Sequence, residues 1–195
     1  MIFFGLKEIL WIPRLLSLSS VVLYGYFSAE QIPFSFWILS LFIILTGFLF
    51  SLDDFTLLGM CSLIALRFSW LKLIFDIKSK IDKKIILIAL SITSLLFGMI
   101  LYLIYTDSIF YYLSIVTTVG LVLLLSTSFS LLTTRGTKFG NKEMFISIAI
   151  FILSDALSGS KKITGTSLFF IILSVVLYNT AYYFLMRAII KNKSK

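Results

Sequence analysis

The sequence contains no histidine and a single cysteine, Cys61. Without histidine the chain lacks the usual general base, the serine–histidine nucleophile pair and the commonest metal ligand. One thiol excludes an internal disulfide and a thiolate-rich metal centre. We therefore expect no metal site and no cofactor, and any acid–base chemistry has to use carboxylates.

Charged residues are also scarce. They make up 13% of the chain, whereas 59% of its residues are hydrophobic; a soluble domain is about a quarter charged. So little polar surface cannot coat a soluble globule. A membrane-spanning helix needs roughly 20 mainly apolar residues, so 195 residues accommodate a few short-looped spans and leave no room for a separate soluble domain.

Apolar runs bounded by charged or turn-forming residues predict the fold class, an all-α polytopic transmembrane helix bundle. It forms one integral-membrane domain, 1–195, of about seven spans, or six to eight if residues 2–12 form a further half-length helix. The predicted spans are 14–29, 33–52, 55–76, 84–105, 108–133, 143–160 and 164–190. The lipid bilayer itself is thus the first expected partner.

The formal net charge is +8, yet the basic residues cluster in short turns between apolar runs. The turns at 78–84 and 135–142 and the C-terminal tail fall on one side of the seven-span arrangement, which predicts a cytoplasmic C-terminus. This pattern argues against a nucleic-acid partner. The N-terminus lacks a signal-peptide cleavage site, so we expect it to stay on the protein, and the compact loops fit a bacterial inner membrane.

Small residues recur inside the predicted spans, at Thr46–Gly47, Thr93 and Gly98, and Thr117–Gly120. In lipid such residues allow helices to pack closely. We interpret them as packing positions within one bundle, and homodimerisation remains an open alternative.

Ionisable side chains inside spans are costly to bury and mark a functional site or a structural contact. Asp155 lies about five residues before the predicted end of its span, roughly 8 Å below the interface, where burial disfavours the ionised form and suits a general acid. Its alternatives are helix capping or pairing with Lys161 or Lys162. Arg67 lies near the bilayer midplane, where it can pair with Asp155 or bind a lipid phosphate, whereas Lys72 is close enough to the end to reach water.

Asp53 and Asp54 form the turn between the second and third predicted spans, on the same side of the membrane as Asp155. One interpretation is an ordinary solvated turn. The other is that one of them faces Asp155 across a cavity, so that two carboxyl groups divide the acid and base roles.

The segment Phe151–Ile163, FILSDALSGSKKI, resembles the signature of the YhhN-like lysoplasmalogenase family: an aromatic, apolar residues, Ser-Asp, a small residue, Leu, then a basic residue. Ser154, Asp155 and Leu157 match it, and the next span is similar to the family's last helix at Tyr178 and Ala181. The chain departs from the family pattern at four positions. These are Phe48, after Gly47, where the family has aspartate; Arg67 and Trp70, after Leu58-Gly59, where it has histidine and tyrosine; and Tyr182, where it has glutamine.

Members of this family are multi-span proteins that hydrolyse the vinyl-ether bond of lysoplasmalogens to a fatty aldehyde and a glycerophospho-amine. The resemblance implies Asp155 as the acid or the cation-stabilising carboxylate, with Asp53 or Asp54 replacing the missing aspartate. It implies a lysophospholipid-type substrate, contacted by a further group of residues. These are Ser154, Arg67, Tyr178, Asn179 and Tyr182.

Two other functional classes compete with this hydrolase. The departures at Phe48, Arg67 and Tyr182 favour a non-catalytic lipid-binding or accessory membrane protein. A small transporter is less favoured, because the sequence has neither an internal duplication with paired broken helices nor a charge-lined span.

Overall fold

The structure, a computed structural model, describes residues 16, 19, 20, 22–24, 26, 27, 32–50, 55–77, 82–103, 108–133, 140–164 and 168–193. Six long helices fill most of these ranges, and no strand occurs in them. The predicted all-α helical bundle is confirmed. The helices are α3 (Phe34–Leu49), α4 (Thr56–Ile77), α5 (Lys83–Leu103), α6 (Ile109–Thr133), α7 (Asn141–Thr164) and α8 (Leu168–Lys193).

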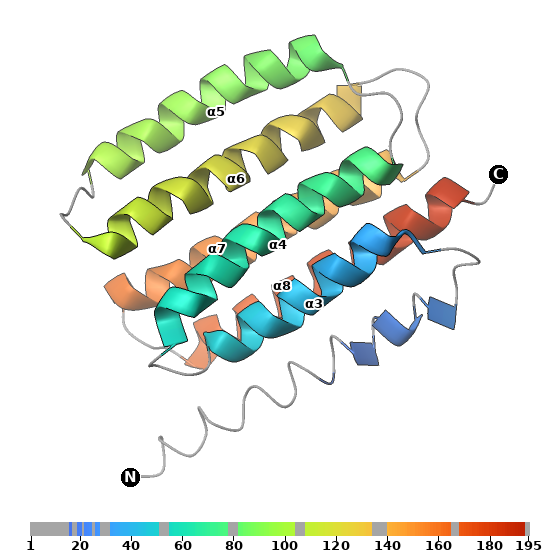
Figure 1. The fold of residues 1–195 in the computed structure, drawn as a ribbon, viewed down its shortest axis with the longest axis horizontal. Coiled ribbons are helices and arrows are strands. Elements are labelled where there is room, and N and C mark those ends of the chain that lie inside the picture. Colours follow the sequence, from blue (N-terminus) through green and yellow to red (C-terminus); the bar gives the residue numbers. More distant parts are fainter. Residues whose placement is uncertain are drawn as a thin grey trace.

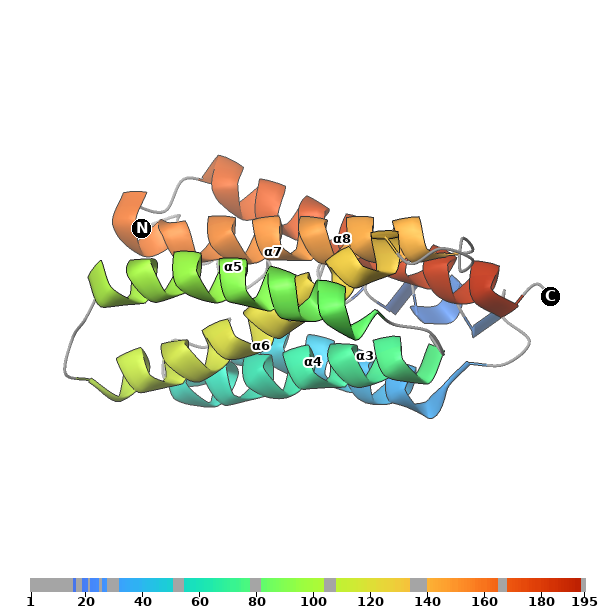
Figure 2. The same cartoon turned by 90° about the horizontal axis from the view of Figure 1, so that it is seen from above.

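Successive helices run in alternating directions along one common long axis (Figure 1). The α3–α4 pair forms one layer and the α7–α8 pair lies behind it (Figures 1 and 2). Helix α6 packs against both α4 and α7 and so joins the two layers along one side. Helix α5 packs on α6 and lies at the edge of the bundle (Figure 1).

The described helices overlap six of the seven predicted spans, but not all have the length and composition of a span. Four of them (α4, α5, α6 and α8) are long and apolar enough to cross a membrane. Helix α3 has 16 residues, which at 1.5 Å per residue falls short of a hydrocarbon core about 30 Å thick. Helix α7 is long enough but carries polar residues at both ends. The predicted first span, 14–29, lies mostly outside the described residues.

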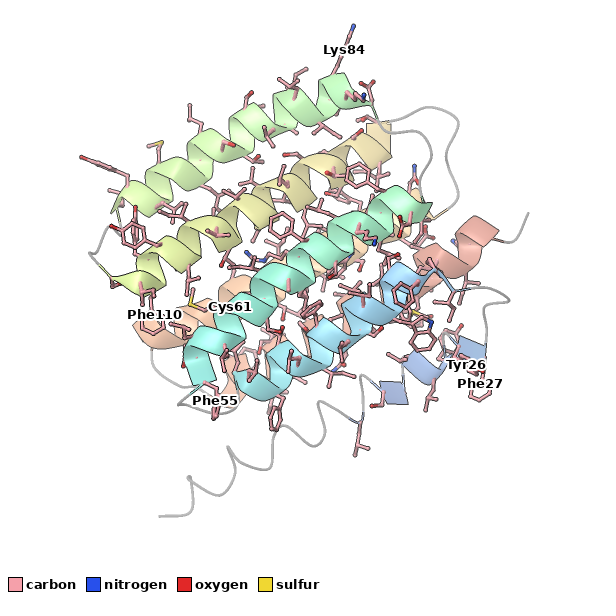
Figure 3. The ribbon with its side chains drawn as sticks, in the orientation of Figure 1. Tyr26, Phe27, Phe55, Cys61, Lys84 and Phe110 are labelled. Carbon is pink, nitrogen blue, oxygen red and sulfur yellow. The ribbon has the colours of Figure 1, made fainter. Side chains whose placement is uncertain are left out.

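Polar side chains fix several helix ends. Asp82 Oδ1 accepts hydrogen bonds from the Lys84 and Ile85 amides and so caps α5, as aspartate commonly does. The Asp82 amide and carbonyl also bond to Ser130 Oγ near the end of α6, which ties the two helix ends together. Lys84 projects outward from the first turn of α5 (Figure 3).

Gly140 begins the last helical hairpin with a φ of +72°. A Cβ atom at this position would lie 2.5 Å from the carbonyl oxygen of Ala188 in α8. Only glycine permits both this left-handed conformation and this close approach. Nearby, Lys191 of α8 forms an ion pair with Glu143 in the first turn of α7.

The core between the layers is aromatic and aliphatic, with Phe36, Trp70, Phe151 and Tyr182 among its largest buried side chains. Hydroxyl groups join neighbouring helices inside it. Thr46 Oγ1 lies 2.7 Å from Ser62 Oγ, between α3 and α4, which agrees with the predicted packing role of Thr46. Gly98 differs from that prediction, because nothing lies within 4 Å of where its Cβ would be.

Candidate functional site

An ion pair joins the two layers near the middle of the bundle. Arg67 lies halfway along α4, and its Nη2 is 2.7 Å from Oδ2 of Asp155 in α7. The side chains are 6% and 20% exposed, respectively. Of the alternatives for Arg67 and Asp155, pairing with each other is therefore the one observed, and the carboxylate is the more accessible partner.

Helix α6 shapes the space that the arginine occupies. Arg67 Nη1 donates a 2.5 Å hydrogen bond to the main-chain carbonyl of Thr117. One turn further along, a Cβ added to Gly120 would lie 3.3 Å from Arg67 Cβ and 3.5 Å from its Cδ. Because Gly120 has no side chain, the Arg67 side chain can pack directly against the backbone of α6.

Helices α4 and α7 make a second contact one turn from the ion pair. Trp70 lies one turn after Arg67 on α4, and Phe151 lies one turn before Asp155 on α7, as expected for antiparallel helices. The Trp70 and Phe151 ring centroids are 4.6 Å apart, and the Phe151 ring also contacts Tyr178 of α8 at 5.7 Å. A cluster of three buried aromatic rings, those of Trp70, Phe151 and Tyr178, therefore lies one turn from the ion pair.

Two N–H donors on this face of α4 have no acceptor in the described part of the chain. They are Arg67 Nε and Trp70 Nε1, and both atoms are buried. Leaving a buried donor unpaired costs roughly 1–3 kcal/mol. Two buried donors beside the ion pair therefore lack an acceptor among the described residues.

The pairing changes the chemistry expected of Asp155. Arg67 Nη2 occupies one oxygen of this carboxylate, so the arrangement suits a carboxylate that stabilises a cation or accepts a proton. The other role considered for Asp155 is that of a general acid. The helix also continues nine residues beyond Asp155 to Thr164, four residues past the predicted end of this span at 160.

The other predicted substrate contacts have hydrogen-bond or ring partners within the bundle. Ser154 Oγ donates to the Ser174 carbonyl of α8 at 2.8 Å. Tyr182 is buried, with its hydroxyl 2.7 Å from Ser40 Oγ of α3. Tyr178 is buried against Phe151, and Asn179 Nδ2 donates to the Val175 carbonyl within its own helix.

The predicted second carboxyl group is not available in the described residues. Asp53 and Asp54 lie outside them. The remaining described acidic residues, Asp76, Asp82 and Glu143, lie at or next to helix ends. Phe48 is 41% exposed whereas Thr46 and Gly47 are buried, so its side chain points away from the core.

Sequence reasoning marked Thr117 and Gly120 as packing positions without connecting them to Arg67, and it noted Trp70 only as a departure from the family pattern. A small residue in a long apolar helix indicates close packing but does not identify the partner. The acceptor at Thr117 is a main-chain carbonyl, which carries no sequence signal. Among the described residues, no group of three or more potential metal ligands exists.

No family model, curated protein or solved structure matches this chain. The likeness to the YhhN-like family therefore depends on the motif residues alone. What the helices do establish is the class: this is a helical membrane protein.

Proposed function

We propose that the chain is a lysoplasmalogenase-like membrane hydrolase that cleaves the vinyl-ether bond of a lysophospholipid-type substrate. The observation that carries the proposal is the Arg67–Asp155 pair, in which a cation in the core orients a more accessible carboxylate. Supporting it is the likeness of Phe151–Ile163 to the family signature around Ser154 and Asp155. The buried rings of Trp70 and Phe151 lie one turn from the pair and give it apolar surroundings.

The proposed reaction begins when an acid protonates the vinyl carbon remote from the ether oxygen. The other vinyl carbon becomes an oxocarbenium ion, which the Asp155 carboxylate stabilises by its charge. Water then attacks that carbon and loses a proton, which gives a hemiacetal. The hemiacetal collapses as its C–O bond to glycerol breaks and the glycerol oxygen takes a proton, releasing a fatty aldehyde.

In this scheme Asp155 is the stabilising carboxylate and Arg67 holds it in place. The proton donor is Asp53 or Asp54, which stand in for the aspartate that Phe48 replaces. Tyr182 and Ser154 hold helices together and are not substrate contacts in this proposal. Two ionised groups already neutralise each other in the pair, so the substrate phosphate is expected to bind nearer the membrane surface.

The experiment is aldehyde release from a defined lysoplasmalogen by the detergent-purified protein. Asp155→Asn should abolish turnover, and an Asp53→Asn/Asp54→Asn double variant should show whether that turn supplies the acid. Asp76→Asn is the matched control, because Asp76 lies at the end of α4. Loss of activity in Asp76→Asn as well would count against a specific role for Asp155.

Asp155→Asn leaves Arg67 with an unpaired buried charge and is liable to unfold. A second variant, Arg67→Met/Asp155→Leu, removes both charges and should fold, since apolar replacement of a whole buried pair is often neutral or stabilising. It should be folded and inactive. Turnover by this double variant, or no turnover by the folded wild type, would contradict the proposal.

The second candidate is a lipid-binding membrane protein without hydrolytic activity. The observation that favours it is that Asp155 is the one carboxyl group within the middle of a helix among the described residues. This candidate predicts that a lysophospholipid remains bound during purification and that the folded Arg67→Met/Asp155→Leu variant binds it as well as the wild type does, measurable by native mass spectrometry.

We further propose that the chain crosses a bacterial inner membrane several times with its C-terminus in the cytoplasm. The basic turns and tail support this orientation. Reporter fusions that are active on only one side of the membrane test it. A fusion after Lys195 should report the cytoplasm, and one inserted in the turn at 104–107 should report the opposite side.

A further inference from the structure

The guanidinium of Arg67 uses two of its three nitrogens. Its Nη2 donates to Asp155 and its Nη1 to the Thr117 carbonyl, while Nε is buried without an acceptor. In a planar guanidinium, the Nε–H and one N–H of Nη2 point from the same edge. That edge binds two oxygen atoms side by side, and here Asp155 Oδ2 is one of them.

We propose that Arg67 Nε binds a neutral oxygen acceptor, a water molecule or a lipid hydroxyl group, directly beside Asp155. The position follows from the shared edge, because an oxygen at Nε is the neighbour of the oxygen at Nη2. A carboxylate has about four acceptor positions, so Asp155 accepts from this oxygen's hydrogen in addition to Arg67. The site thus contains one donor and one acceptor for a single O–H group.

Charge decides that the acceptor is neutral. Arg67 and Asp155 already cancel each other at a contact of 2.7 Å. A phosphate or carboxylate at Nε would place a second negative charge beside Asp155 in a buried setting, where an unpaired charge costs several kcal/mol. A water or hydroxyl adds no charge and satisfies the orphan donor, which disfavours the alternative in which Arg67 binds a lipid phosphate.

Trp70 supports the same conclusion independently. Its Nε1 is a second buried donor without an acceptor among the described residues, one turn from Arg67 on the same face of α4. Both side chains extend toward α7, where their contacts are Asp155 and Phe151. Two neighbouring buried donors between α4 and α7 thus lack acceptors among the described residues, as expected where a bound oxygen completes the hydrogen bonding.

If the proposed hydrolysis holds, this oxygen has a chemical role. The water at Arg67 Nε forms its bond to the oxocarbenium carbon, the C=O⁺ electron pair returns to the ether oxygen, and the proton released by the water passes to Asp155. Arg67 is then a positioning residue for the hydrolytic water. This role rests on the proposed function, whereas the binding of the oxygen does not.

The direct test is nuclear magnetic resonance on protein labelled with ¹⁵N-arginine in detergent micelles. The four arginine Nε–H signals are assigned by elimination with Arg14→Lys, Arg135→Lys and Arg187→Lys, none of which alters the buried pair. In a rotating-frame experiment, a dipolar cross-peak from Arg67 Nε–H to water shows bound water. A cross-peak to the glycerol C2 proton of added 1-O-alkyl-lysophosphatidylethanolamine, a saturated ether, shows a lipid hydroxyl.

Cross-peaks from Arg67 Nε–H only to aliphatic and aromatic protons of the protein would overturn the proposal. A large ³¹P shift of the added lipid that disappears in Arg67→Lys would also overturn it, because it indicates a phosphate at this position. These readouts do not require turnover, so an inactive wild type would refute the hydrolase and leave the oxygen site standing.

The kinetic test compares Arg67→Lys with Arg187→Lys as the matched control. Lysine keeps the positive charge beside Asp155 but has no Nε–H edge. We expect kcat to fall about 100-fold, the effect of a misplaced reactant, with KM unchanged, in Arg67→Lys only. A folded Arg67→Lys protein with unaltered kcat would contradict the positioning role while leaving the hydrolase proposal intact.

Discussion

Arg67 in α4 and Asp155 in α7 form a 2.7 Å ion pair although 87 residues separate them in the chain. Two antiparallel helices bring these side chains to the same level. Helix α6 provides the Thr117 carbonyl that accepts a hydrogen bond from Arg67, and its Gly120 leaves space for the arginine side chain. A cation and an anion thus occupy the interior of an otherwise apolar bundle.

Replacing one member of this ion pair should destabilise the protein far more than replacing both members together. Arg67→Met and Asp155→Leu each leave one buried charge and should cost about 3–5 kcal/mol, whereas the double variant should lie near wild type. Unfolding in mixed detergents, followed by circular dichroism, gives the double-mutant cycle. Additive losses in the double variant would mean that the two residues do not interact.

Gly140→Ala should be strongly destabilising. The added Cβ meets the Ala188 carbonyl at 2.5 Å, and alanine tolerates the φ of +72° poorly; the backbone term alone is of order 1–3 kcal/mol. Gly98→Ala is the matched control, since its Cβ enters open space in the middle of a helix and should be neutral or slightly stabilising. Equal effects of the two substitutions on the midpoint of thermal unfolding would argue against the close approach of α7 and α8.

Tyr182→Phe distinguishes a packing role from a substrate contact. The variant loses the hydrogen bond to Ser40 Oγ but keeps the ring against Phe36. Hydrogen bonds between membrane helices contribute about 0.6 kcal/mol on average, so a modest loss of stability with unchanged KM is expected. A rise in KM without a change in stability would restore Tyr182 as a substrate-binding residue.

The ion pair between Glu143 and Lys191 should contribute little. The lysine side chain is 44% exposed, and exposed pairs typically contribute about 0.2–1 kcal/mol. Lys191→Met should therefore lower stability slightly, and the difference from wild type should shrink as salt is raised. An effect as large as that of Arg67→Met would show that this end of the bundle is more tightly coupled than its exposure indicates.

The sequence by itself determined that this is a helical membrane protein and where most helices lie, because apolar length is a local property that needs no partner. It also singled out Arg67 and Asp155, since charge inside an apolar run is visible in one dimension. Gly120 and Thr46 were likewise recognisable as packing positions.

Only the tertiary structure decided what those residues contact. Asp155 pairs with Arg67 of α4, a contact that the sequence offered only as one alternative. Helix rotation and register also direct Tyr182 toward Ser40 and Ser154 toward the Ser174 carbonyl. The main-chain acceptor at Thr117 follows from the same rotations. Rotation about a helix axis depends on how large and small side chains fit between neighbouring helices, and that fit involves residues far apart in the chain.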